Sequence, residues 1–250
     1  MKVKVFQDSR ELGKAAAAEA AAVLNQAIAA QGKARLLVST GASQFDTFQA
    51  LVTQKVDWRK VEMFHLDEYV NLPADHPASF RRYLKERFAN LVRLGECHFV
   101  NTEGEIAKCI ANLTAAIRKE PIDLALVGIG ENAHLAFNDP PADFWTDAAF
   151  IVVDLDENCK KQQVGEGWFP TVAAVPGQAV TITVPQIMQS KVIISAVPHR
   201  VKANAIKLTL ENEVTPEIPA TKLKEHPQVT IFLDEESASL ASEELFRRYR

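Results

Sequence analysis

The apolar run from Leu124 to Val127 is followed by a Gly-rich turn that contains the imidazole of His134 and the carboxylate of Asp139. Side chains of these two types are suited to proton transfer. The run is typical of a strand buried on both faces, and in open α/β sheets ligands bind where such strands end. A Gly-rich loop that merely turns the chain is the alternative, so the assignment depends on similar strand ends elsewhere.

A second strand end carries two adjacent carboxylates. The segment from Val61 to Tyr69 includes Asp67 and Glu68. Because successive residues of an extended segment point to opposite sides, at most one of them can face the turn that holds His134, while the other caps or pairs locally. A cap for the following turn explains the two acids equally well.

A third strand end is the segment from Ala34 to Ser39. It leads into a loop of small residues: Thr40, Gly41, Ala42 and Ser43. Ser43 and Asp46 have the spacing of a capping box, which predicts a helix that begins near Ser43. Free N–H groups and hydroxyls at such a position suit a phosphate or a carboxylate. An ordinary helix cap is the alternative, and it explains every feature except the paired small residues Gly41 and Ala42.

Composition favours one compact enzyme-like domain over residues 1–250. The chain has 47% hydrophobic and 24% charged residues, which is ample for a large core. Its net charge is −4, without a basic run, so nucleic acid and anionic membranes are not expected partners. Three cysteines without C-x-x-C spacing argue against structural zinc and against a disulfide framework, and they fit a reducing cytoplasm.

The elements that must position these residues alternate between strand and helix. Strands are predicted near Val3–Phe6, Leu36–Ser39, Val61–His65, Cys97–Val100, Leu124–Val127, Ala179–Thr183, Val192–Ala196 and Val229–Leu233. Helices are predicted near Ser9–Ala30, Ser43–Thr53, Ala78–Phe88, Glu105–Lys119, Arg200–Leu210 and Ser237–Tyr249. This alternation predicts βαβ units and a mainly parallel sheet. The atypical segment 143–176, with aromatic residues among Gly and Pro, is either a lid over the site or a packed surface insertion.

The chain resembles the glucosamine-6-phosphate deaminase (isomerase) family, which is related to the 6-phosphogluconolactonases. The matching segments are STGAS at 39–43, HLDEYVNLPADHPASF at 65–80, GIGENAHLAFNDP at 128–140, and the tail from VPHRVKANAIK through HPQVTIFLDE. The LDEYV and HLAFNDP matches favour the deaminase branch. The resemblance implies a Rossmann-like α/β three-layer sandwich, in agreement with the alternation.

The resemblance also implies a reaction. This is the conversion of glucosamine 6-phosphate to fructose 6-phosphate with loss of ammonia, without a metal or another cofactor. His134 matches the ring-opening histidine of the family, and Asp139 the residue that orients or tunes it. Asp67 matches the base that takes the C2 proton and returns it to C1. For the phosphate, the resemblance assigns the Thr40 to Ser43 loop and Lys202, which by sequence alone reads as a solvated surface lysine.

Several positions depart from the family pattern. Asn132 and Ala133 stand where many deaminases have Asp and Gly, and Asp139 stands where the family often has Glu. Asn cannot act as a base but still forms hydrogen bonds, and Ala133 is restricted if the turn needs a positive φ. The phosphate-binding arginine of the family's lid region has no evident counterpart, and Lys160 or Lys161 is the candidate replacement, with weaker geometry.

Glu68 and Glu131 are further candidate substrate contacts. Three alternatives stay open. The substrate could be another amino-sugar phosphate such as galactosamine 6-phosphate, the reaction could be lactone hydrolysis of 6-phosphogluconolactone, or the protein could be a catalytically silent sugar-phosphate sensor. The sequence also leaves open a homo-oligomer.

Overall fold

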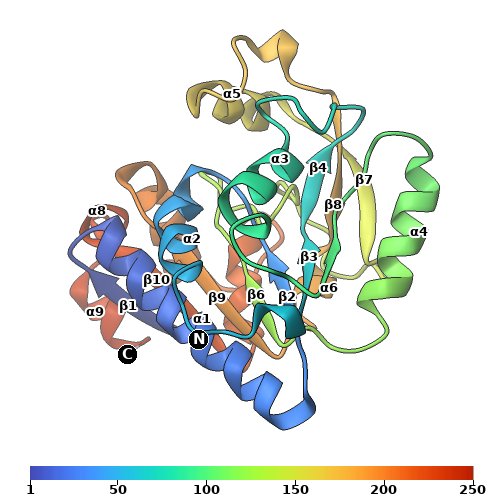
Figure 1. Cartoon of the computed structure of the whole chain (residues 1–250). Coiled ribbons are helices and arrows are strands. Elements are labelled where there is room, and N and C mark those ends of the chain that lie inside the picture. Colours follow the sequence, from blue (N-terminus) through green and yellow to red (C-terminus); the bar gives the residue numbers. More distant parts are fainter. Residues whose placement is uncertain (250) are drawn as a thin grey trace.

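A seven-stranded parallel sheet forms the centre of the molecule (Figure 1). The computed structural model describes residues 1–249 of the chain. In spatial order the strands are β1 (Lys2–Phe6), β10 (Val229–Asp234), β9 (Val192–Val197), β6 (Leu124–Leu126), β2 (Ala34–Val38), β3 (Val61–His65) and β5 (Glu96–His98). The inner strands are apolar on both sides, as parallel strands covered by helices must be. The predicted α/β fold with a mainly parallel sheet is therefore confirmed.

Helices cover both faces of this sheet and make a three-layer sandwich. Leu36 and Val38 of β2 pack in one hydrophobic cluster with Leu12 of the first helix, whereas Leu37 packs in the other with Leu113. This alternation is what a strand buried on both faces requires. Helices of the first cluster are α1 (Ser9–Gln31), α2 (Phe45–Leu51) and α3 (Phe80–Leu84). Those of the second are α4 (Ile106–Ile117), α6 (Val184–Ile187), α7 (Ala203–Glu211), α8 (Glu235–Ala238) and α9 (Glu243–Arg247).

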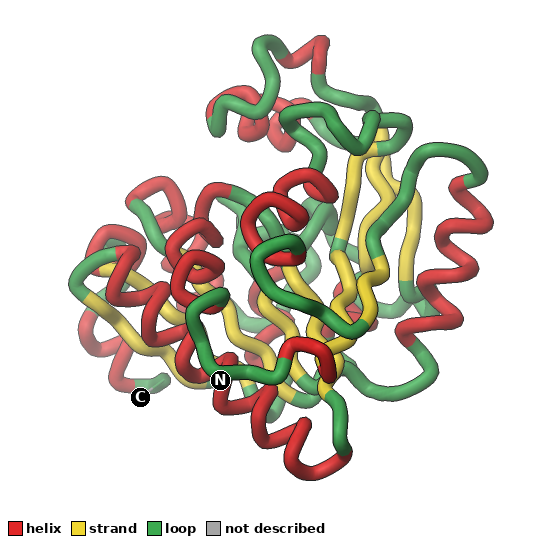
Figure 2. The backbone as a smooth tube through the Cα atoms, in the orientation of Figure 1, coloured by secondary structure: helices red, strands yellow, loops and turns green. Residues whose placement is uncertain are grey.

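A second, antiparallel sheet stands beside the first (Figure 2). It consists of β4 (Asp67–Tyr69), β8 (Gln178–Ile182) and β7 (Phe150–Asp154). The predicted strand at Ala179–Thr183 is present as β8, but it belongs to this sheet. One hydrophobic cluster contains Ile231 of β10 and Val127, which follows β6, together with Val180 of β8, so the two sheets share a core.

Several predicted helices differ from the structure. The single helix expected at Ser237–Tyr249 is wrong, since α8 and α9 are separate and Ser242 caps the second by accepting from the N–H of Leu245. The helix expected at Ala78–Phe88 starts at Phe80 and widens into a π turn at Lys85–Ala89. Short 3₁₀ turns occupy Ala42–Gln44, Trp58–Lys60, Val172–Ala174, Arg200–Lys202 and Pro219–Glu225.

The atypical segment 143–176 contains two regular elements that the sequence did not reveal, β7 and α5 (Glu157–Gly165). Asp156 caps α5, because its side chain accepts from the N–H of Cys159 at 2.7 Å. The segment packs through Leu155 and Phe169 against Tyr69 of β4. It is a folded part of the molecule, and α5 lies beyond the ends of the strands (Figure 1).

The strand order reverses direction between β2 and β6. From β2 the chain continues to β3 and β5 on one side, whereas from β6 it continues to β9 and β10 on the other. In open α/β sheets such a switch point leaves a crevice at the carboxyl ends of the strands, where ligands bind. The loops after β2 and β6 are those that carry Thr40 to Ser43 and His134.

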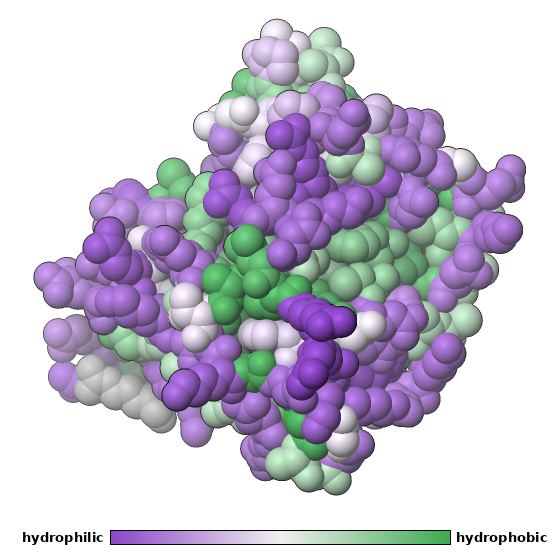
Figure 3. Space-filling model, in the orientation of Figure 1, coloured by the Kyte–Doolittle hydropathy of each residue, from purple (hydrophilic) through white to green (hydrophobic). Residues whose placement is uncertain are grey.

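The surface is mainly hydrophilic. Figure 3 shows one face of the molecule, where polar side chains surround an apolar patch near the centre. Over residues 1–249, no helix combines the length and the apolar character needed to cross a membrane.

Candidate active site

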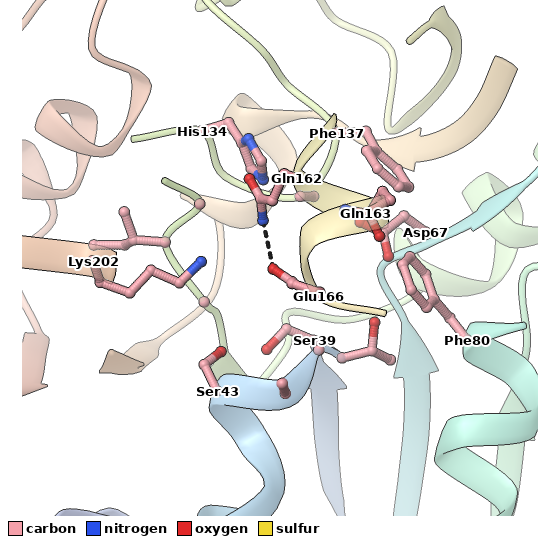
Figure 4. Close-up of a pocket in the computed structure, with 17 residues that line it drawn as sticks. Ser39, Ser43, Asp67, Phe80, His134, Phe137, Gln162, Gln163, Glu166 and Lys202 are labelled. Atoms are coloured by element: carbon pink, nitrogen blue, oxygen red, sulfur yellow. Dashed lines mark hydrogen bonds between the residues drawn. The ribbon is translucent and has the colours of Figure 1, made fainter. Parts of the chain in front are cut away.

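A cavity of about 80 Å³ opens at the switch point between β2 and β6. It brings together the predicted loop Thr40 to Ser43, Asp67, His134 and Lys202 (Figure 4). These residues come from four separate strand ends, and their convergence is what the parallel sheet predicts.

The loop after β2 is shaped by Gly41, which has a φ of +104°. Residues with a side chain rarely adopt this conformation, so the turn requires glycine. The hydroxyl of Tyr83 on α3 donates to the carbonyl of Gly41 at 3.0 Å and holds the loop in place. The predicted capping box is wrong, because no side chain caps this turn and Asp46 instead accepts from the Ser9 hydroxyl at 2.6 Å.

The imidazole of His134 rests directly on Gly130. A Cβ at residue 130 would lie 2.2 Å from Nε2 of His134, so only glycine leaves room for the ring. Ala133 has a φ of +66°, so this turn does need the left-handed backbone conformation that a residue with a side chain rarely adopts. Ala133 adopts it, and its carbonyl accepts from the N–H of Ala220 at 2.9 Å.

Asp139 and Asn132 stand behind His134. Asn132 donates from Nδ2 to Oδ1 of Asp139 at 2.9 Å and accepts from the N–H of His134 at 3.2 Å. Nδ1 of His134 lies 3.0 Å from the same Asp139 oxygen, although its direction falls outside that of a well-formed hydrogen bond. Burial acts to raise the pKa of Asp139. The interactions of its carboxylate with the His134 imidazole and with the Asn132 amide outweigh this effect, so the pKa is lowered. Asp139 is therefore a carboxylate that faces the imidazole.

Asp67 lines the cavity from strand β4 and is 6% exposed. Burial, assisted by the charge of Glu68, raises the pKa of Asp67 to about 8. A carboxyl group with this pKa holds a proton readily near neutral pH, which is the property of an efficient general base or acid.

Glu68 points the opposite way, as alternation along a strand requires. Its carboxylate accepts from the Ser79 hydroxyl at 2.8 Å, from the N–H of Arg81 at 2.9 Å and from Nε of Arg81 at 3.2 Å. It is completely buried and lies outside the lining of the cavity. Glu68 thus fastens the start of α3 to the strand that carries Asp67.

Lys202 reaches the cavity from the 3₁₀ turn that precedes α7 and is 6% exposed. Burial lowers the pKa of its ammonium group, while the carboxylates of Glu166 and Glu131 oppose that shift. Among the cavity-lining residues in the described part of the chain, Lys202 is the only lysine or arginine. A buried lysine at this position is not the solvated surface lysine that the sequence also allowed.

The other candidate contacts lie outside this lining. Lys161 is exposed, with Nζ 3.6 Å from Oε2 of Glu157, and Lys160 is half-buried. Lys161 lines a neighbouring depression together with Glu131 and Asn132. The structure therefore brings neither lysine into the lining of the cavity.

Sequence reasoning missed the contribution of segment 143–176 to the cavity. Gln162, Gln163 and Glu166 line the cavity from α5 and the residue that follows it (Figure 4). Their spacing of three and four residues is that of one helical face, a signal that a helix prediction for this segment would have shown. Ser39 and the aromatic residues Phe80 and Phe137 also line the cavity.

Fold and site together define an α/β protein with a candidate ligand site at a topological switch point of its parallel sheet. The profile described as "Glucosamine-6-phosphate isomerases/6-phosphogluconolactonase" matches residues 7–232, and the chain belongs to this family.

The chain is similar to deaminases in sequence and in structure, and it shares its fold with a lactonase. The glucosamine-6-phosphate deaminase of Bacillus pumilus (strain SAFR-032) is 33% identical, with 96% of this chain and 100% of that protein covered. That of Shouchella clausii (strain KSM-K16) is 34% identical, with 89% and 92% covered. The structure of a monomeric glucosamine-6-phosphate deaminase has a TM-score of 0.89 at 28% identity, covering 96% of this chain and 100% of that one. A 6-phosphogluconolactonase from Thermotoga maritima has a TM-score of 0.77 at 19% identity, covering 93% and 99%, and so shares the fold.

Proposed function

We propose that this protein converts glucosamine 6-phosphate, or a close amino-sugar 6-phosphate, to fructose 6-phosphate and ammonia. The observation that carries the proposal is the convergence of Asp67, His134 and Lys202 on one cavity. An acid and an imidazole on different sides of a sugar can serve two separate proton transfers. The relatives at 33–34% identity named above support the same activity.

The phosphate group is assigned to the end of the cavity formed by Lys202 and the Thr40 to Ser43 loop. A buried ammonium group supplies positive charge to a cavity whose other described lining residues include no lysine or arginine, and the hydroxyls of Thr40 and Ser43 supply hydrogen bonds. Fixing the phosphate at this end would place the opposite end of the sugar near Asp67 and His134.

His134 is assigned to ring opening. Its Nε2 side rests on Gly130 at the cavity, while Nδ1 faces the Asp139 carboxylate. The imidazole takes the proton of the C1 hydroxyl and delivers a proton to the ring oxygen, so that the C1–O5 bond breaks and an open-chain aldehyde forms. Asp139, positioned by Asn132, would stabilise the imidazolium that forms in between.

Asp67 is assigned to the isomerisation. The ionised carboxylate removes the proton from C2, and the aldehyde oxygen takes a proton from the neighbouring C2 ammonium group. The resulting enolamine accepts the proton held by Asp67 at C1 to give an iminium group at C2. Water then adds to C2 and ammonia leaves, which produces the ketone of fructose 6-phosphate. A raised pKa makes Asp67 a stronger base for the first step and a proton donor of suitable strength for the second.

The segment 143–176 is assigned the role of a lid. The cavity of about 80 Å³ is smaller than the roughly 300 Å³ or more that is usual for small-molecule sites. Because α5 contributes Gln162 and Gln163 to the lining, an outward movement of α5 would enlarge the cavity enough to admit a hexose phosphate. Substrate entry would then depend on this movement.

We place the enzyme in a reducing cytoplasm, where its free cysteines Cys97, Cys109 and Cys159 would stay reduced. The sequence left open a homo-oligomer, and light scattering of the purified protein would measure the assembly state. One structural relative is described as monomeric.

The test is an ammonia assay with glucosamine 6-phosphate and galactosamine 6-phosphate on the wild type and on Asp67→Asn. We expect the wild type to release ammonia and fructose 6-phosphate from the former, and the variant to bind the substrate with little turnover. Acid release from 6-phosphogluconolactone without ammonia release would instead support the lactonase alternative. Ligand binding without either reaction would support a sensor.

A further inference from the structure

The carboxylate of Glu166 lines the cavity without forming an ion pair with a residue in the described part of the chain. Gln162 donates from Nε2 to Oε1 of Glu166 at 2.8 Å, and Trp168 donates from Nε1 to Oε2 at 3.0 Å. Within residues 1–249, no lysine, arginine or histidine nitrogen lies within 4.0 Å of this carboxylate. Two neutral donors therefore fix its orientation, and the ammonium group of Lys202 acts on its charge only from beyond ion-pair distance.

A carboxylate held in this way still has room for further donors. Its two oxygens together accept about four hydrogen bonds, and the two bonds described above leave the rest free. In a partly enclosed cavity an unpaired negative charge attracts a cation and repels an anion. The lid face toward the cavity therefore consists of one acid and the two amides of Gln162 and Gln163. This face suits the amino and hydroxyl groups of a sugar, not its phosphate.

Glu166 lies between the two ends of the cavity. In Figure 4 it is flanked by Lys202 on one side and Asp67 on the other. Burial raises the pKa of Tyr69, which is two residues from Asp67 on β4, and the charges of Asp67 and Glu166 are among the groups that raise it further. The charges of Asp67 and Glu166 thus both affect the hydroxyl of Tyr69.

We propose that Glu166 determines specificity for an amino sugar by binding the C2 ammonium group of the substrate. The inference depends on the proposed function, because it assigns the phosphate to Lys202 and the C2 proton to Asp67. The amino group is attached to the carbon that loses this proton, so its binding partner must lie close to Asp67 on the cavity wall. Glu166 is an acid that lines the same cavity as Asp67 and is not needed as the base.

The experiment compares two unreactive ligands that differ only at C2, namely 2-amino-2-deoxyglucitol 6-phosphate and glucitol 6-phosphate. Their dissociation constants are measured by calorimetry for the wild type, for Glu166→Gln and for the matched control Glu157→Gln. Glu157 lies on the same helix, and its side chain is 79% exposed. We expect the wild type and the control to prefer the amine, and Glu166→Gln to reduce that preference roughly tenfold to a hundredfold by weakening the amine alone.

Other results would overturn the inference. Equal weakening of both ligands would mean that Glu166 only holds the lid through Gln162 and Trp168. Tighter binding of both would mean that it only repels the phosphate, and an unchanged preference would exclude contact with the amine. The ammonia assay is independent of these affinities. A protein that prefers the amine but releases no ammonia would refute the proposed reaction and retain the selectivity of Glu166.

Discussion

Replacing Asp67 with Asn should abolish activity and at the same time stabilise the folded protein. The pKa of Asp67 is about 8 in the folded state because of burial and the nearby charge of Glu68, whereas an unfolded chain has an Asp pKa of about 3.9. Between these two values the unfolded chain releases the proton and the folded protein keeps it. The stability that the neutral carboxyl contributes is therefore fully present below about pH 4 and is lost as the pH rises through about 8.

The size of this effect follows from the same shift. At pH 7 the wild type should be less stable than Asp67→Asn by roughly 4 kcal/mol, which is the free energy of about three pKa units. The amide cannot ionise, so it removes the dependence on pH without changing the shape of the side chain. The change of this stability difference with pH measures the raised pKa more directly than its size at one pH does, because burying the amide has a free-energy cost of its own.

Urea unfolding at pH 5, 6, 7 and 8 measures this difference. We expect the gap between variant and wild type to grow by about 1.4 kcal/mol for each pH unit in this range. The control is Asp147→Asn, which replaces an exposed acid outside the cavity lining. Its stability should depend on pH as that of the wild type does. Parallel stability curves for wild type and Asp67→Asn would refute the raised pKa and the reasoning on the base.

Three further predictions concern activity. The value of kcat/KM should rise with pH and level off above about 8, because the ionised form of Asp67 removes the C2 proton; a flat profile from pH 6 to 9 would contradict this role. Lys202→Ala should raise KM roughly tenfold to a hundredfold, whereas Lys161→Ala should leave it unchanged in the same initial-rate assay. Gly130→Ala should lower kcat/KM at least about tenfold while circular dichroism stays native, because the new methyl group occupies the space of the His134 ring; normal turnover would show that the ring position is not critical.

The sequence predicted the central sheet well because its strands carry strong and simple signals. The run that ends at Val38 is apolar at every position except Arg35 and is followed by small polar residues and Gly. The same rule placed Asp67 and His134 at strand ends, and the structure places them on one cavity. Lys202 carried no such local signal, and the family resemblance was needed to single it out.

The second sheet and the lid were not predictable by the same means. Strand β4 has only three residues, two of them acidic, and its pairing with β8 is a long-range contact that local patterns do not encode. Helix α5 is polar almost throughout, since Cys159 and Gln163 are its only buried residues. A helix without an apolar stripe has little periodic signal. The cavity-facing role of Glu166 was missed for this reason.

The strand that carries Asp67 is also tied to the lid. Tyr69 lies two residues further along β4, on the same side as Asp67, and its hydroxyl donates to Oε1 of Gln163 at 2.6 Å. If α5 moves outward as proposed, this bond must break or the strand must follow. A chimera that takes segment 143–176 from a relative would then need a matching hydrogen-bond partner at position 69 to keep the contact between α5 and the strand that carries Asp67.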